Sequence, residues 1–184
     1  MKTNESMAKY IIRLAATLLI ITAVVAAALA GVNSITKPII EQLNYEKTQK
    51  AIEAVLPGGG ESIDFTDSTG WVTTVYKSDK GYAVEVTPTT GFDGEITMMV
   101  GIDLNGNVLG ISIVSHTETA GLGAVAAATT SAGEAFRGQF VGTSGSVSVS
   151  KDGGSIDAIT GATITSRAVC DGVNAALACV TNMG

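Results

Sequence analysis

Two short stretches hold the residue types from which a binding site could be built. The stretch DAITGAT, Asp157–Thr163, precedes the last apolar period of the chain, and SHTETAGLG, residues 115–123, follows a predicted strand. Gly161 disfavours a helix at its own position, and an apolar pattern with helical spacing begins just after Thr163. Thr163 is therefore expected at or near a helix N-terminus. Free N–H groups and the positive end of the helix dipole make such a terminus an anion site, most often for phosphate.

Small residues at Gly161 and Ala162 would let a bulky ligand approach the backbone. The alternative is an ordinary helix start, in which Thr160 or Thr163 is the N-cap and the following hydroxyls fill the first turn. The residues alone leave both interpretations open.

Other kinds of chemistry find little support in the sequence. His116 is the one histidine, and no serine and aspartate stand at a spacing that would suggest a hydrolytic triad. Cys170 and Cys179 are nine residues apart in the predicted last helix, which puts them on opposite faces, and they lack metal-ligand spacing. We therefore predict no catalytic side chain and no metal site, and interpret both cysteines as buried apolar residues.

The remaining pattern predicts an α+β fold with a mostly antiparallel sheet packed on helices. Two apolar arms, 96–102 and 108–114, flank Asn105-Gly106, a pair that favours tight hairpin turns. The other predicted elements are a helix over 39–56, strands within 71–87 that turn near 78–81, partial helix over 119–140, a strand and turn over 145–156, and a closing helix over 164–183.

The N-terminus has the pattern of a membrane segment. A basic lead with Lys2, Lys9 and Arg13 precedes the uncharged residues 14–32, and about 20 apolar residues suffice to cross a bilayer. A cleaved signal peptide is the alternative, and Ala28-Leu29-Ala30 fits it. The length of the apolar run and its continuation into a helix favour a retained anchor. The positive-inside rule then places the N-terminus in the cytoplasm and the domain outside.

These patterns divide the chain into a cytoplasmic N-terminus at 1–13, a transmembrane helix at 14–34, a helical connector at 35–60 and a folded domain at 61–184. The net charge is −6 and the sequence shows no basic patch, so nucleic acid is not an expected partner.

Together the motifs resemble the FMN-binding domain family, whose members carry covalently attached FMN. DAITGAT matches the flavinylation motif, SHTETAGLG its companion motif, and the segments 91–103 and 136–140 also fit. The resemblance covers most of residues 7–180. It implies a phosphoester between Thr163 and FMN, made by a separate Mg²⁺-dependent flavin transferase that recognises Asp157 and Thr160. It further implies that the flavin ring lies against Glu118, Thr119, Leu122 and the backbone near Gly121 and Gly123.

Within that family the chain resembles most the G subunits of Rnf complexes, and next the C subunits of Na⁺-translocating NADH:quinone reductases. Family members commonly have proline where this chain has Ala120. The resemblance implies a plasma-membrane, single-pass, electron-transfer flavoprotein with a phosphate-linked cofactor. It would act within a translocase that moves electrons between ferredoxin and NAD⁺, coupled to Na⁺ or H⁺ export. The partners implied are the A, B, C, D and E subunits of the Rnf complex, above all the membrane-embedded ones and the D subunit.

Two other functions compete with this one: a membrane-anchored extracytoplasmic FMN-binding reductase outside any Rnf complex, and an anchored assembly domain without a cofactor. The roles of three further residues stay open. His116 can form a structural hydrogen bond at the end of its strand or lie beside the flavin. Trp71 fits a place in the hydrophobic core better than one stacked on the flavin ring. Arg167 can pair with a phosphate or be solvated.

Overall fold

The computed structural model describes residues 2–183, and its elements follow the predicted order. Helices and 3₁₀ helices are α1 (Lys2–Val55), η1 (Gly123–Ala127), α2 (Ser131–Gly138), η2 (Ser150–Asp152) and α3 (Thr163–Met183). Strands are β1 (Glu61–Ile63), β2 (Val72–Ser78), β3 (Gly81–Val86), β4 (Ile96–Asp103) and β5 (Val108–His116). The predicted α+β class is confirmed. The contacts divide the chain into two compact units, one up to Tyr45 and one from Glu46 onward.

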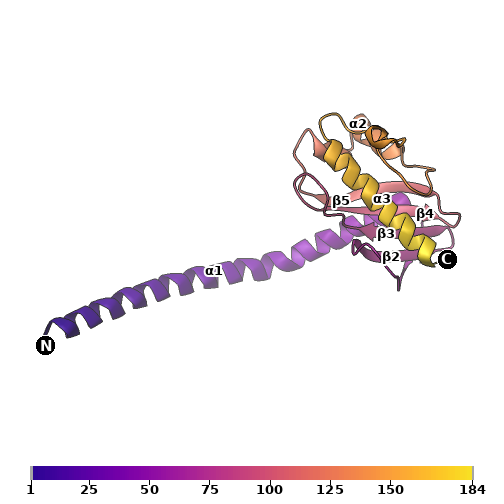
Figure 1. The fold of residues 1–184 in the computed structure, drawn as a ribbon. Coiled ribbons are helices and arrows are strands. Elements are labelled where there is room, and N and C mark those ends of the chain that lie inside the picture. Colours follow the sequence, from indigo (N-terminus) through magenta and orange to yellow (C-terminus); the bar gives the residue numbers. More distant parts are fainter. Residues whose placement is uncertain (1, 184) are drawn as a thin grey trace. The chain divides into compact units, whose positions relative to one another are not determined.

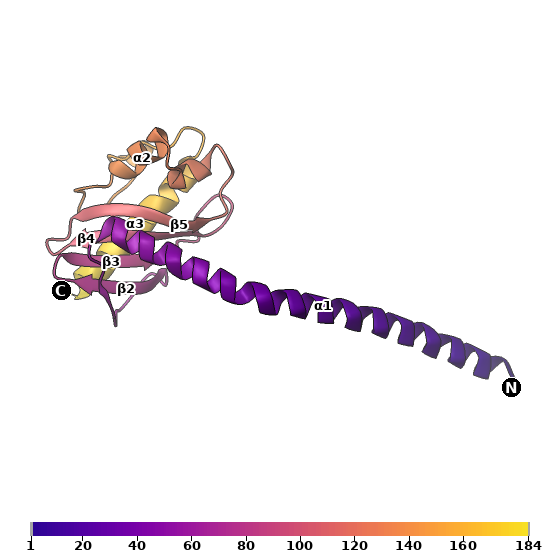
Figure 2. The ribbon, with the colours of Figure 1, turned by 180° about the vertical axis from the view of Figure 1, so that it is seen from behind.

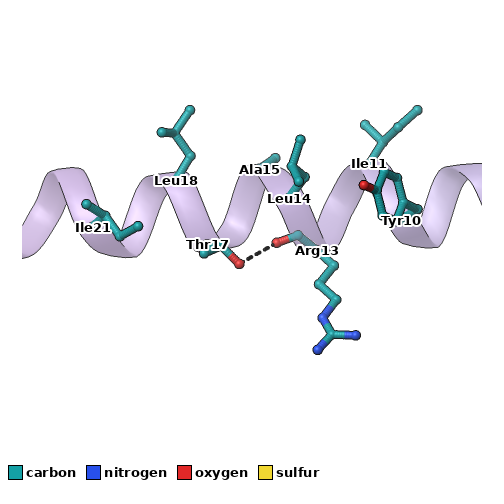
Figure 3. A pocket seen from close by; sticks show the side chains of 8 residues that line it. All are labelled: Tyr10, Ile11, Arg13, Leu14, Ala15, Thr17, Leu18 and Ile21. Atoms are coloured by element: carbon teal, nitrogen blue, oxygen red, sulfur yellow. Dashed lines mark hydrogen bonds between the residues drawn. The ribbon is translucent and has the colours of Figure 1, made fainter.

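The described part of the first unit is the N-terminal part of α1, a helix that is long and apolar enough to cross a membrane. Its hydroxyl groups need not stay unpaired in lipid, because Thr17 donates to the Arg13 carbonyl and Thr22 to that of Leu18. Figure 3 shows the Thr17 bond, with Ile11 and Leu18 on the side of the helix opposite the Arg13 guanidinium. The predicted limits of the spanning segment, residues 14 and 34, lie within this continuous helix and stay a prediction.

The sheet of the second unit is antiparallel throughout, with strand order β1-β2-β3-β4-β5. The predicted hairpin is β4–β5. Gly106 has φ +82°, and the Asp103 carboxylate accepts hydrogen bonds from the backbone N–H groups of Asn105 and Asn107, each at 2.8 Å. Because each strand pairs with its neighbour in sequence, the sheet forms without a crossover connection.

Each face of the sheet is covered by a helix. The side chains of α3 pack with one face in a core that includes Val84, Met98 and Val173. The last turns of α1 cover part of the other face, where Ile52 and Val55 contact Met99. Figures 1 and 2 show α3 and the end of α1 on opposite sides of the sheet.

Two local predictions were wrong. The expected strand over 145–156 is a single bridge between Val149 and Ile156 together with η2, because no neighbouring strand offers this segment a ladder. Trp71 is half-buried at the start of β2 and does not belong to the buried core. The predicted helix over 119–140 divides into η1 and α2, separated by Thr130, whose hydroxyl accepts a hydrogen bond from the Gly133 N–H and caps α2.

The end of α1 lies so close to β4 that a side chain at Gly101 has no room. A Cβ there would overlap the Val55 carbonyl oxygen. We expect Gly101→Ala to lower the free energy of unfolding by about 1–3 kcal/mol, as overpacking usually does. Gly110→Ala is the control. Gly110 lies opposite Gly101 on β5, and a Cβ there would meet the Val55 side chain at an ordinary contact distance of 4.0 Å. Denaturant unfolding in detergent measures both, and equal stability of the two variants would contradict this account of the packing.

Candidate functional site

The two stretches singled out in the sequence meet at one cavity of about 340 Å³. That volume lies in the range of small-molecule sites, about 300–1,000 Å³. Its walls come from the loop before β4, the loop after β5, η2 and the start of α3. The lining residues are Phe92, Glu118, Thr119, Leu122, Gly123, Lys151, Gly161, Ala162, Thr163, Ile164 and Thr165. The cavity therefore brings together most of the predicted site residues, namely Glu118, Thr119, Leu122, Gly123, Gly161, Ala162 and Thr163, whereas Gly121, Asp157 and Thr160 do not line it.

A buried carboxylate, that of Glu118, joins three of these segments. The side chain is 7% exposed, and its Oε1 accepts from the Phe92 N–H at 2.8 Å. Its Oε2 accepts from the Thr165 hydroxyl at 2.7 Å. Gly123 makes this arrangement possible, because a Cβ at that position would overlap Glu118 Oε2. A buried carboxylate is tolerated only when it is hydrogen-bonded, and here the bonds also fix the cavity wall.

The threonines beside Glu118 hold the loop that carries Phe92. Thr117 donates to the Asp93 carbonyl at 2.8 Å, and Thr119 donates to the Asp93 carboxylate at 3.0 Å. Three consecutive side chains, Thr117, Glu118 and Thr119, therefore bind one short loop. Sequence reasoning had selected Glu118 and Thr119 but had missed Phe92 and Asp93, which lie more than 20 residues earlier.

The start of α3 is not capped by a threonine, contrary to one of the sequence interpretations. Gly161 has φ +77° and Ala162, which has no side-chain oxygen, directly precedes the first helical residue, Thr163. The hydroxyl of Ser166 instead accepts from the Ile159 N–H at 3.0 Å and donates to the Ala162 carbonyl at 2.9 Å. The Thr163 hydroxyl is thus free of the helix backbone and lines the cavity.

Lys151 is the main residue that sequence reasoning missed. Its ammonium group donates to the Thr163 hydroxyl at 3.2 Å. Among the described residues, no carboxylate lies within ion-pair distance of this ammonium group. The lysine is 12 residues from Thr163 in a segment predicted as a strand, so no motif spacing could have indicated it.

Arg167, the cation that the sequence did suggest, is engaged elsewhere. It forms a two-point pair with the Asp152 carboxylate, with nitrogen–oxygen distances of 2.7 and 2.8 Å. The guanidinium donates to Asp152 and so lowers the pKa of that carboxyl group, which keeps the pair charged. The positive charge at the mouth of the cavity is therefore that of Lys151.

The remaining candidate residues lie outside the cavity lining. His116 ends β5 with a buried Nδ1 that has no hydrogen-bond partner in the described part of the chain. Burial raises the pKa of the Cys170 thiol to about 12, which disfavours the reactive thiolate at neutral pH. Among the side chains that the structure describes, no group of three histidine, cysteine or acidic residues could hold a metal ion.

The cavity thus has apolar walls and one cationic end. Three large apolar side chains that line it are left open to solvent: Phe92 at 63%, Leu122 at 44% and Ile164 at 46%. Exposed apolar groups around a cavity mark a binding site for an apolar ligand. The helix N-terminus and Lys151 favour a negative charge at the other end. The site therefore suits an apolar molecule with an anionic group.

Comparisons with known proteins agree with this geometry. Residues 91–178 match the model of the FMN-binding domain, and residues 1–55 match that of the RnfG N-terminal region. The chain is 33% identical to the G subunit of the Na⁺-translocating ferredoxin:NAD⁺ oxidoreductase complex of Acetobacterium woodii, over 100% of this chain and 99% of that protein. The G subunit of the ion-translocating oxidoreductase complex of Methanosarcina acetivorans is also 33% identical, over 92% and 94%.

A third relative is the G subunit of the proton-translocating ferredoxin:NAD⁺ oxidoreductase complex of Clostridium ljungdahlii, 33% identical over 83% of this chain and 82% of that protein. Because the similarity extends over both the N-terminal helix and the domain with the cavity, it covers the whole architecture. The chain belongs to the family of G subunits of ion-translocating Rnf oxidoreductase complexes and carries their FMN-binding domain.

Proposed function

We propose that this chain is an electron-transfer subunit of an Rnf complex and carries FMN as a phosphoester on Thr163. The observation that supports the attachment site most directly is the position of the Thr163 hydroxyl. It lies at the start of α3, lines the cavity and accepts a hydrogen bond from Lys151. A hydroxyl in this place can be esterified without loss of a helix cap.

The charges fit such an ester. A phosphate linked to both threonine and flavin keeps one negative charge, and Lys151 supplies one positive charge beside Thr163. The helix dipole adds a further favourable contribution, typically about 0.3–1 kcal/mol. The charge of Arg167 is already paired with that of Asp152, so Arg167 is not needed to balance the charge of the ester.

The cavity walls would hold the ring. Leu122, Phe92 and Ile164 provide the apolar surface, and Glu118 keeps the wall in place through Phe92 and Thr165. Bound flavin would supply the redox chemistry, and the protein residues would supply position and charge. Thr119 and the backbone near Gly121 and Gly123 remain proposed ring contacts.

The attachment itself requires a second protein. A threonine hydroxyl is a weak nucleophile without a base, and its one hydrogen-bonded neighbour with an ionisable group, Lys151, donates to it. We infer that a flavin transferase brings an activated flavin phosphoanhydride. As the bond between Thr163 Oγ and the flavin phosphorus forms, the anhydride bond breaks, the second phosphate leaves as a monoester, and the hydroxyl proton passes to a base of the transferase. Asp157 and Thr160 are exposed, and residues that such an enzyme recognises must be exposed.

The proposed partners are the A, B, C, D and E subunits of the Rnf complex, because the relatives are named as components of such complexes. Electron flow between ferredoxin and NAD⁺ would be coupled to Na⁺ or H⁺ translocation by the whole complex. The basic residues before the spanning segment favour an N-terminus in the cytoplasm and an FMN domain outside the plasma membrane. Co-purification with the other subunits would separate this function from that of a free-standing extracytoplasmic reductase.

The attachment site is tested by Thr163→Ala in a strain that also produces a flavin transferase. We expect this variant to lose the fluorescent band on a denaturing gel and the mass excess of FMN minus water, about 438 Da. Thr181→Ala is the matched control, because it removes a hydroxyl from the same helix away from the cavity. Covalent flavin retained in Thr163→Ala would refute the assignment.

The role of Lys151 is tested by Lys151→Met. A charge-assisted hydrogen bond of typical strength is lost, so we expect covalent flavin to accumulate about tenfold more slowly. Lys151→Arg should keep most of the rate. Lys80→Met serves as the control, since that lysine donates to the Pro57 carbonyl outside the site. Unchanged loading of Lys151→Met would show that the ammonium group does not assist the phosphate.

The anchor is tested by removing residues 1–32, which leaves the turns of α1 that pack on the sheet. We expect the shortened chain to fold and to leave the membrane fraction, because the remaining helix has lost its long apolar run. Circular dichroism and membrane fractionation measure the two properties. A shortened chain that is folded and still bound to membranes would contradict a single N-terminal anchor.

A further inference from the structure

The side chain of Gln139 holds the backbone of Asp157, the first residue of the DAITGAT motif. Its Oε1 accepts from the Asp157 N–H at 2.7 Å, and its Nε2 donates to the Asp157 carbonyl at 3.2 Å. One amide group thus satisfies both backbone groups of one residue, as a neighbouring strand would. The two residues are 18 positions apart in sequence.

Gln139 stands on a rigid support. It is the C-cap residue of α2, and Phe140, which follows it, is fully buried. Phe136 and Phe140 pack edge to face with ring centroids 5.5 Å apart. Arg137 fixes α2 to η1, because it donates to the carbonyls of Ala126 and Ala128 at 2.6 and 2.9 Å. The amide of Gln139 is therefore anchored to the core through its neighbours.

The motif is held at both ends by side chains outside it. Gln139 binds the backbone of its first residue, and Ser166 binds the Ile159 N–H and, near the end of the motif, the Ala162 carbonyl. The side chains of Asp157 and Thr160 are exposed, and the bonds from Gln139 use only the backbone of Asp157. The Asp157 carboxylate is left to face another molecule.

We propose that Gln139 is a positioning residue for flavin attachment. It keeps the DAITGAT loop in the conformation that presents the Asp157 carboxylate and the Thr163 hydroxyl together to the flavin transferase. This proposal rests on the proposed attachment of FMN to Thr163. If the loop were ordered in only a fraction of the molecules, the apparent Michaelis constant of the transferase for this chain would rise by the inverse of that fraction.

The test uses the full chain in detergent, with a purified flavin transferase and its flavin substrate. Gln139→Leu removes both bonds, and Asn174→Leu is the matched control. Asn174 makes the same two-point contact with the Val147 backbone, at 2.7 and 2.8 Å, away from the motif. We expect Gln139→Leu to raise the Michaelis constant about tenfold with kcat unchanged, as two ordinary hydrogen bonds allow. Asn174→Leu should leave both constants unchanged.

Two further measurements separate positioning from general stability. Hydrogen exchange should show faster exchange of the Asp157 amide in Gln139→Leu, whereas Asn174→Leu should not change it. Gln139→Glu keeps an acceptor for the Asp157 N–H and loses the donor to its carbonyl, so it should raise the Michaelis constant less than leucine does. This second variant also covers the case in which Gln139→Leu does not fold.

Each outcome bears on one proposal. Wild-type constants in the Gln139 variants, or unchanged exchange of the Asp157 amide, would overturn the role of Gln139 alone. A fall in kcat with an unchanged Michaelis constant would overturn it too, because presentation of the loop would then not be the step affected. Thr163→Ala is loaded in parallel. Covalent flavin in that variant would instead overturn the proposed attachment site.

Discussion

The buried carboxylate of Glu118 is the interaction on which the cavity depends. It binds the Phe92 N–H and the Thr165 hydroxyl, and so joins the loop before β4 to the start of α3. A carboxylate without these partners would be costly to bury. The close approach of Gly123 and the bonds of Thr117 and Thr119 to Asp93 follow from the same arrangement. The cavity is thus built into the fold before any ligand is considered.

The opposite wall is organised by side chains that bind backbone groups. Ser166 holds Ile159, Gln139 holds Asp157, and Gly161 allows the chain to turn into α3. Because these contacts shape the start of α3, the Thr163 hydroxyl is not needed to cap the helix. It accepts a hydrogen bond from Lys151 instead. A modification at this hydroxyl would therefore cost the fold little. This separation of structural and reactive groups is what links the local structure to the proposed covalent flavin.

Sequence patterns predicted the fold well where the controlling contacts are local. Asn105-Gly106 fixed the β4–β5 hairpin, and the apolar periods indicated α1 and α3. The segment around Val149 was misjudged because alternation predicts a strand only where a partner strand exists. Lys151 was not found by pattern, and the fit of the segment 136–140 did not indicate what Gln139 contacts, since each side chain reaches the motif across a dozen or more residues by tertiary folding. The sequence analysis named Arg167 as a candidate cation, but it did not predict the ion pair of Arg167 with Asp152.

Peptide mapping of the wild-type chain, produced together with a flavin transferase, tests the central claim most directly. Trypsin cuts after Lys151 and Arg167, so the peptide from Asp152 to Arg167 contains the whole motif. Fragmentation of that peptide by mass spectrometry should place the flavin phosphate on Thr163. An unmodified peptide, or a flavin on Thr160 or Thr165, would contradict the account.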